Sequence, residues 1–106
     1  MNKRNIILIG MPGAGKSSVG VILAKVLGYE FIDTDLVIQH REKRLLREII
    51  ADEGNEGFLA IENEVNATLE ADKSVIAPGG SAIYGKEAME HFKEIGTIVY
   101  LKLSYE

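Results

Sequence analysis

A glycine-rich segment between a short apolar run and an amphipathic segment constrains this chain more than any other feature. Residues 10–17 read GMPGAGKS and satisfy the pattern G-x-x-x-x-G-K-[ST] at every fixed position. Glycine has no side chain to bury and loses entropy on ordering, so these residues do not serve a hydrophobic core. Such a loop lets backbone N–H groups converge on phosphate oxygens, and the positive end of the following helix faces the same anion. The segment therefore predicts a binding site for the phosphates of a nucleotide.

The residue types in and after this loop indicate how the phosphates would be held. The predicted contacts to the nucleotide come from Gly13, Ala14, Gly15, Lys16, Ser17 and Ser18. Lys16 can reach the β- and γ-phosphates, where it would also act in catalysis, and the Ser17 hydroxyl can ligate Mg²⁺. No guanine-reading N-K-x-D segment occurs, which favours ATP over GTP. The alternative, a glycine-rich turn with an incidental lysine, would match the pattern by chance in about 1 of 200 chains of this length, or fewer.

The remaining apolar segments predict an α/β fold in one domain, residues 1–106. Strands are expected at residues 6–9, 29–32, 74–77 and 97–103. Helices are expected at 17–27, in two pieces over 36–51, around a face formed by Phe58, Ile61, Val65 and Leu69, and at 86–94. Gly28 would end the first helix, and Gly54 and Gly57 would precede the helix of that apolar face. Strands that alternate with helices of this length connect by right-handed crossovers into a parallel sheet.

Composition and charge exclude several classes of function. The formal net charge is −4 and the pI about 5.2, whereas a protein that binds nucleic acid without sequence preference normally has a basic surface. Cysteine is absent, which excludes disulfides and thiolate metal sites and is compatible with a reducing cytoplasm. The apolar run at 6–9 is too short for a signal peptide, and no segment approaches the ~20 apolar residues that span a bilayer. We expect a cytoplasmic protein without a membrane or nucleic-acid partner.

Two carboxylates, Asp33 and Asp35, follow the second expected strand. Ligands of open α/β sheets bind at the carboxyl ends of the strands, so both side chains are expected near the phosphate loop. One carboxylate can hold a water of the Mg²⁺ shell, and the other can accept a proton from a hydroxyl that attacks the γ-phosphate. The alternative is that Thr34 or Asp35 only caps the next helix. The neighbouring phosphate loop favours the first interpretation.

A second glycine-containing turn follows the third expected strand, at Pro78, Gly79, Gly80 and Ser81. Consecutive glycines allow a polar ligand to approach backbone N–H groups closely. A plain turn accounts for a Pro-Gly pair equally well. The residues alone leave both interpretations open.

Together these segments resemble shikimate kinase, a P-loop kinase that phosphorylates a hydroxyl of a small carboxylated cyclohexene. The resemblance rests on GMPGAGKSSVG, FIDTD, a G-x-x-x-F-x-x-x-E pattern at Gly54, Phe58 and Glu62, then PGG and TIVYLKLS. It implies a three-layer P-loop kinase-like fold with a parallel sheet in the order 2-3-1-4. It also implies that Ser17 and Asp33 serve the metal, that Asp35 contacts or deprotonates the substrate hydroxyl, and that Gly79 and Gly80 meet the substrate through their backbone.

Three substitutions depart from the family pattern. Leu59 stands where the family has an arginine that clamps the substrate carboxylate, and leucine cannot make that bidentate contact. Ile50 replaces a phenylalanine of the substrate pocket, and Ser81 replaces a third glycine. Substitute positive charge could come from Arg41, Arg44 and Arg47, although arginines on a solvated helix face are the more common case.

The sequence ends at Ser104, Tyr105 and Glu106, where the family continues into a lid, a fifth strand and further substrate-binding and adenine-binding residues. We therefore expect a domain that is incomplete at its C-terminus, lacks the last strand and lid, and is inactive by itself. The strand at 97–103 would lie uncovered at the sheet edge, which predicts self-association through that edge. A monodisperse monomer at high concentration would contradict this expectation.

Three functions remain open at this point. The first is an ATP-dependent small-molecule kinase of the shikimate kinase type, with shikimate or a similar hydroxylated compound as its partner. The second is a nucleotide-binding module without kinase activity, for which Leu59 would mark the loss of substrate recognition. The third is a kinase of the same fold that acts on an uncarboxylated polyol, for which Leu59 is no handicap.

Overall fold

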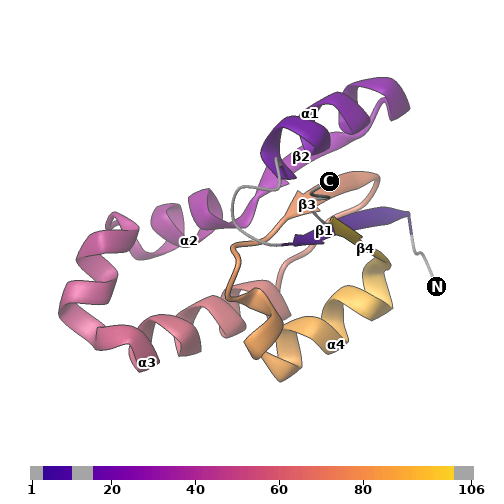
Figure 1. The fold of residues 1–106 in the computed structure, drawn as a ribbon. Coiled ribbons are helices and arrows are strands. Elements are labelled where there is room, and N and C mark those ends of the chain that lie inside the picture. Colours follow the sequence, from indigo (N-terminus) through magenta and orange to yellow (C-terminus); the bar gives the residue numbers. More distant parts are fainter. Residues whose placement is uncertain (1–3, 11–15, 102–106) are drawn as a thin grey trace, which may run out of the picture.

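The chain folds around a four-stranded parallel sheet. The structure, a computed structural model, describes residues 4–10 and 16–101, without the side chain of Lys16. The strands are β1 (Asn5–Gly10), β2 (Glu30–Asp33), β3 (Ser74–Ala77) and β4 (Gly96–Leu101). They lie in the order β2-β3-β1-β4, and every neighbouring pair is parallel (Figure 1). This order confirms the expected one; residues 102–103 of the expected fourth strand lie outside the described residues.

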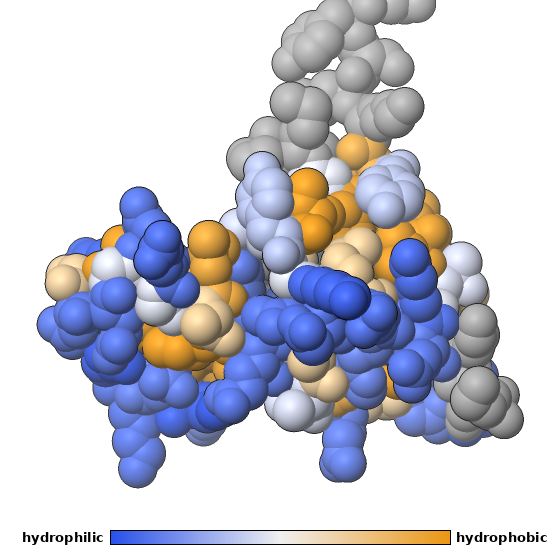
Figure 2. All heavy atoms as spheres, turned by 90° about the horizontal axis from the view of Figure 1, so that it is seen from below, coloured by the Kyte–Doolittle hydropathy of each residue, from blue (hydrophilic) through white to orange (hydrophobic). Residues whose placement is uncertain are grey.

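Helices cover the sheet on both faces, which makes three layers. Helix α1 (Lys16–Leu27) packs over β2 and β3, and α3 (Leu46–Ala67) and α4 (Lys86–Ile95) lie on the other side (Figure 1). Helix α2 (Thr34–Glu42) and the first part of α3 extend away from the sheet as an arm. A short 3₁₀ helix, η1 (Ala82–Tyr84), precedes α4. Figure 2 looks onto the side of α3 and α4, where hydrophilic side chains cover most of the surface.

The core is divided by the sheet because successive strand residues point to opposite faces. Two clusters of buried side chains result: Ile7, Ile9, Ile76, Ala88 and Phe92 on the α4 side, and Leu8, Ala24 and Val75 on the α1 side. A third cluster, Ile38, Ile49 and Val65, packs α2 against both parts of α3. Strands β1 and β3 are buried on both faces, as their continuous apolar runs predict.

The region between β2 and β3 differs in part from the expectation. Within α3 two helical segments meet at a kink at Gly54, whose φ of 76° and ψ of 175° are not helical, in agreement with the expected break; Gly57 lies inside the second segment rather than before it. Only glycine adopts this backbone conformation readily, which explains the residue type at the kink. Leu69 lies beyond the end of α3 and packs on the α4-side cluster rather than with Phe58. Its expected place on the apolar face is therefore wrong.

Helix α1 is predicted by the helical spacing of Val19, Ile22, Leu23, Val26 and Leu27, of which only Leu23 packs on the core. The apolar side chains of Ile22 and Val26 are 64% and 77% exposed. Gly20 and Ala24 face the sheet instead, and a Cβ at position 20 would lie 2.5 Å from Phe31 Cε1. Small residues one turn apart allow α1 to approach the sheet closely. Of its larger apolar side chains, Leu23 packs half-buried against the α1-side cluster, and the others are exposed.

Among the described strands, β4 lies at one edge of the sheet and pairs with β1 alone. Its side chains at Val99 and Tyr100 are 38% and 63% exposed. An exposed edge strand presents unpaired backbone groups to other chains, so self-association through β4 stays a prediction. Among the described residues, no helix has the length and apolar character needed to cross a membrane.

Candidate active site

The predicted site residues meet at the carboxyl edge of the sheet. Strands β1, β2 and β3 end there at Gly10, Asp33 and Ala77, because the strands are parallel. A hollow of about 190 Å³ opens at this edge, lined by Ser17, Asp33, Asp35, Ala77, Pro78, Gly79 and Gly80. Five residues that the sequence analysis selected from three separate segments therefore surround one space.

The structure describes the predicted phosphate loop at its first residue, Gly10, and from Lys16 onward. Residues 11–15, with Gly13, Ala14 and Gly15, lie outside the described residues, as does the side chain of Lys16. Lys16 is the first residue of α1, so the helix begins where the loop motif predicts. Ser17 lines the hollow, whereas the exposed Ser18 is not among its lining residues.

Asp33 both ends β2 and caps α2. Its backbone is extended, with φ of −97° and ψ of 111°, and its Oδ1 accepts a hydrogen bond of 2.9 Å from the backbone N–H of Asp35. The capping role that the alternative interpretation gave to Thr34 or Asp35 thus belongs to Asp33, because Thr34 is already helical. This cap holds Asp35 in the first turn of α2, beside the same hollow as Asp33.

Mg²⁺ fits the oxygen atoms at this place. Ser17 supplies a hydroxyl and Asp33 a carboxylate, and both residues line the hollow at the N-terminal end of α1. Mg²⁺ prefers oxygen ligands and is usually held by one or two protein groups together with substrate phosphates and waters. The donor set is therefore of the right chemical type, although Asp33 Oδ1 is already engaged in the helix cap.

Glu62 is a site residue to which the sequence analysis assigned no role. It is 2% exposed, and its Oε1 accepts a 2.7 Å hydrogen bond from Ser81 Oγ. Its Oε2 has no hydrogen-bond partner among the described residues. A signal was present in the sequence, since Glu62 lies among Phe58, Ile61 and Val65 on the apolar side of α3. A glutamate among buried neighbours seldom remains without a specific partner.

Gly79 lies against the two carboxylates of Asp35 and Glu62. A Cβ at this position would lie 2.9 Å from Asp35 Oδ1 and 3.1 Å from Glu62 Oε2. Any side chain would therefore push against both groups, which explains glycine here without invoking an unusual backbone angle. The plain-turn interpretation also holds, since the N–H of Ala82 donates to the carbonyl of Gly79 at 3.0 Å.

Burial raises the pKa of Glu62, and the negative charge of Asp35 raises it further, while the hydrogen bond from Ser81 acts in the opposite direction. Because the pKa of Glu62 is higher in the folded state than in the unfolded state, the contribution of Glu62 to stability is fully present at pH values below its unfolded-state pKa. That stability is lost as the pH rises through the folded-state pKa. We expect Glu62→Gln to match the wild type in stability at acidic pH and to exceed it increasingly toward neutral pH.

Urea unfolding of both proteins between pH 4 and 8 tests this expectation. The difference in unfolding free energy should grow by about 1.4 kcal/mol per pH unit between the two pKa values and then level off. Glu70→Gln, at an exposed glutamate beyond α3, is the matched control. A difference between wild type and Glu62→Gln that is constant with pH would contradict the expectation.

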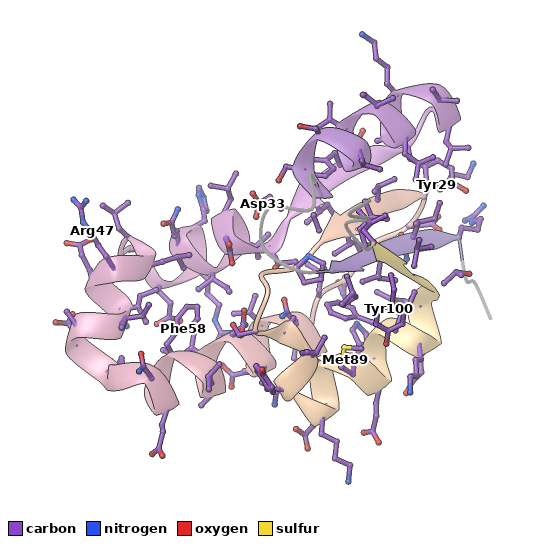
Figure 3. All side chains as sticks on the ribbon, viewed as in Figure 1. Tyr29, Asp33, Arg47, Phe58, Met89 and Tyr100 are labelled. Carbon is purple, nitrogen blue, oxygen red and sulfur yellow. The ribbon has the colours of Figure 1, made fainter. Side chains whose placement is uncertain are left out.

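The three arginines considered as substitute charges lie on the arm. Arg41 pairs with Glu64 and Glu42, and Arg44 pairs with Glu42, Asp52 and Glu53. Figure 3 shows Arg47 at the outer end of α3, far from Asp33. Of the three, only Arg41 and Arg44 border any of the described hollows, and those are hollows of the arm. These surroundings support the interpretation that the three arginines lie on solvated helix faces rather than in the site.

Comparison with known proteins gives a consistent result. The family model described as shikimate kinase matches residues 12–106. Shikimate kinase 2 of Yersinia enterocolitica is 39% identical over 101 residues, which cover 95% of this chain and 58% of the relative. Shikimate kinase 2 of Yersinia pseudotuberculosis is 37% identical over 101 residues, which again cover 95% of this chain and 58% of the relative. The chain thus spans 58% of the length of these curated relatives.

Solved structures resemble this fold closely. A shikimate kinase from Acinetobacter baumannii in complex with shikimate has a TM-score of 0.85 and 37% identity, over 94% of this chain and 56% of its own. A shikimate kinase from Aquifex aeolicus has a TM-score of 0.81 and 33% identity, over 95% of this chain and 61% of its own.

Proposed function

The chain belongs to the shikimate kinase family, and on that premise we propose that it forms the phosphate-binding and acceptor-binding part of an ATP-dependent kinase. Its substrate would be shikimate or a similar small hydroxylated compound. One observation carries the proposal: Ser17, Asp33, Asp35, Gly79 and Gly80 border a single hollow at the carboxyl edge of the sheet. A hollow of this kind at such an edge is the usual ligand site of open α/β folds.

The residues divide into three groups in this proposal. Phosphate contacts come from Gly13, Ala14, Gly15, Lys16, Ser17 and Ser18, with Lys16 balancing the charge of the transferred group. Ser17 and Asp33 would hold Mg²⁺, which when bound neutralises phosphate charge. Asp35, Gly79 and Gly80 would hold the acceptor molecule. The backbone N–H groups of the two glycines are hydrogen-bond donors that an acceptor hydroxyl can approach closely.

Asp35 would act as the general base. The acceptor hydroxyl gives its proton to the Asp35 carboxylate, and the hydroxyl oxygen forms a bond to the γ-phosphorus of ATP. The bond between that phosphorus and the β–γ bridging oxygen breaks, and ADP leaves with the electron pair. Asp35 lies in the first turn of α2, where the positive end of the helix favours a carboxylate. Glu62 Oε2 lies close to Gly79, as Asp35 Oδ1 does, and Glu62 also lines a second hollow of about 280 Å³.

An assay of the full-length protein with MgATP tests the proposal. ADP release that depends on added shikimate, or on another polyhydroxylated acceptor from a small panel, is the expected result. A nucleotide-binding module without kinase activity is the second candidate, favoured by the neutral Leu59. It predicts ATP binding by calorimetry with no acceptor-dependent ADP, and this outcome would contradict the kinase proposal.

A further inference from the structure

The turn that follows β3 carries two of the proposed acceptor contacts, Gly79 and Gly80, and lies outside the regular sheet. Strand β3 ends directly before the turn, and the next regular element is the 3₁₀ helix η1. Within the turn, the N–H of Ala82 donates to the carbonyl of Gly79 at 3.0 Å. This local hydrogen bond shapes the turn but does not by itself place it relative to the rest of the hollow.

Ser81 ends this turn and uses its hydroxyl for a distant contact. It is the N-cap residue of η1, and serine before a helix commonly accepts a hydrogen bond from the helix backbone. Here its side chain forms no capping hydrogen bond with the described residues of η1. Instead, Ser81 Oγ donates a 2.7 Å hydrogen bond to Glu62 Oε1 in α3, 19 residues earlier in the chain. The hydroxyl therefore joins the turn to α3.

Glu62 contacts the turn on both sides of Gly80. Its Oε1 is bonded to Ser81, and its Oε2 would lie 3.1 Å from a Cβ at Gly79. Because the side chain is only 2% exposed, solvent does not readily replace the donor if the Ser81 hydroxyl is removed. Both carboxylate oxygens would then lack a partner among the described residues, which is unfavourable for a buried group and favours movement of the side chain. Such movement would remove the support of the turn at Gly79.

The next residue of α3 provides a purely structural contact for comparison. Asn63 Oδ1 accepts a 2.9 Å hydrogen bond from the N–H of Ala88, and its Nδ2 donates to Glu87 Oε1 at 2.9 Å. Both partners lie in the first turn of α4, and neither lines the hollow at the carboxyl edge of the sheet. Neighbouring side chains of α3 thus hold two successive parts of one segment: Glu62 holds the turn, and Asn63 holds α4.

We infer that Ser81 is a positioning residue of the acceptor site: its hydroxyl holds Glu62, and Glu62 holds the turn at Gly79. The inference rests on the proposed function, because it assumes that Gly79 and Gly80 contact the acceptor. It goes further by giving a role in acceptor binding to a side chain that acts through another one. A glycine at position 81 could not form this hydrogen bond, so the serine is what makes the link possible.

Calorimetric titration of the full-length protein tests the inference. The ligand is shikimate, or the acceptor of the panel that supports ADP release, with a non-hydrolysable ATP analogue present. We expect Ser81→Ala to weaken acceptor binding about tenfold, the loss of one hydrogen bond to a charged group, and to leave binding of the ATP analogue unchanged. Ser81→Thr keeps the hydroxyl and should restore the affinity. Asn63→Ala is the matched control: it should lower the thermal unfolding midpoint without changing acceptor affinity.

A double variant shows whether Ser81 acts through Glu62. Glu62→Met keeps a side chain of similar length but removes the carboxylate that accepts from Ser81. If the two residues act as a pair, Ser81→Ala should change acceptor affinity by less than about twofold in the Glu62→Met background. A loss as large as that in the wild-type background would mean that Ser81 contacts the acceptor directly, and this result overturns the inference.

The remaining outcomes separate this inference from the kinase proposal. Acceptor affinity of Ser81→Ala within about threefold of the wild type overturns the inference, as does an equal loss of affinity in Asn63→Ala. Acceptor-dependent ADP release by the wild type together with an unaffected Ser81→Ala leaves the kinase and removes the inference. Weaker acceptor binding by Ser81→Ala without any turnover by the wild type leaves the positioning role and removes the kinase. A wild type that binds no acceptor removes both.

Discussion

Asp35→Asn is expected to lower the rate of phosphoryl transfer by the full-length protein about 10²–10⁴-fold, the usual contribution of a general base. Asparagine has nearly the same shape but its amide does not accept the proton of the acceptor hydroxyl. The backbone N–H of residue 35, which donates to Asp33, remains in place, so α2 keeps its cap. ATP binding should be unchanged. Steady-state ADP release and calorimetric titration of ATP measure the two effects separately.

Two further variants make the Asp35 result specific. Asp33→Asn keeps a side chain that caps helices equally well but removes the charge offered to a cation, so it should raise the Mg²⁺ concentration required for activity. Asp72→Asn removes an exposed carboxylate that pairs with Arg4 at the opposite end of β3, and its activity should match the wild type. An Asp35→Asn protein with activity within about threefold of the wild type would exclude Asp35 as the base.

Asn5→Ala is expected to destabilise the protein by about 3 kcal/mol or more, because it leaves three backbone groups without a partner. Asn5 is 1% exposed at the start of β1. Its Nδ2 donates to the carbonyls of Ala71 and Ile95, both at 2.9 Å, and its Oδ1 accepts from the N–H of Ser74 at 3.0 Å. One side chain thus joins the beginnings of β1, β3 and β4.

Urea unfolding of the full-length protein measures this loss. Asn55→Ala, at an exposed asparagine in α3, is the matched control and should change stability by no more than about 0.5 kcal/mol. A loss below about 1 kcal/mol for Asn5→Ala would show that water replaces the three hydrogen bonds.

Local patterns explain what the sequence predicts well. The apolar runs of β1 and β3 mark strands buried on both faces, and the glycine-rich motif marks the start of α1. Because the strands are parallel, their carboxyl ends lie at one edge of the sheet. The parallel arrangement alone therefore predicts that Asp33, Asp35 and Gly79 lie close together, as they do around the hollow. The family resemblance supplied the strand order, which β-strand patterns alone do not determine.

Features that depend on distant contacts could not be predicted. Asn5 bonds to groups 66 to 90 residues away, and Glu62 bonds to Ser81 across 19 residues. No periodicity along the chain indicates such partners. The buried side of α1 was missed for a related reason: hydrophobicity points to Ile22 and Val26, whereas close packing on Phe31 selects Gly20. Small residues contribute little to a hydrophobic pattern but decide how near a helix approaches a sheet.

The hydrogen bond from the N–H of Asp35 to Asp33 Oδ1 has a consequence for how the two substrates influence each other. In the proposed mechanism Asp35 contacts the acceptor, and Asp33 holds the Mg²⁺ that accompanies the nucleotide. A shift of the Asp33 carboxylate upon coordination would therefore be transmitted through a single 2.9 Å bond to the base. Thermodynamic linkage makes this cooperativity reciprocal. If binding of the nucleotide changes the affinity for the acceptor by some factor, binding of the acceptor changes the affinity for the nucleotide by the same factor.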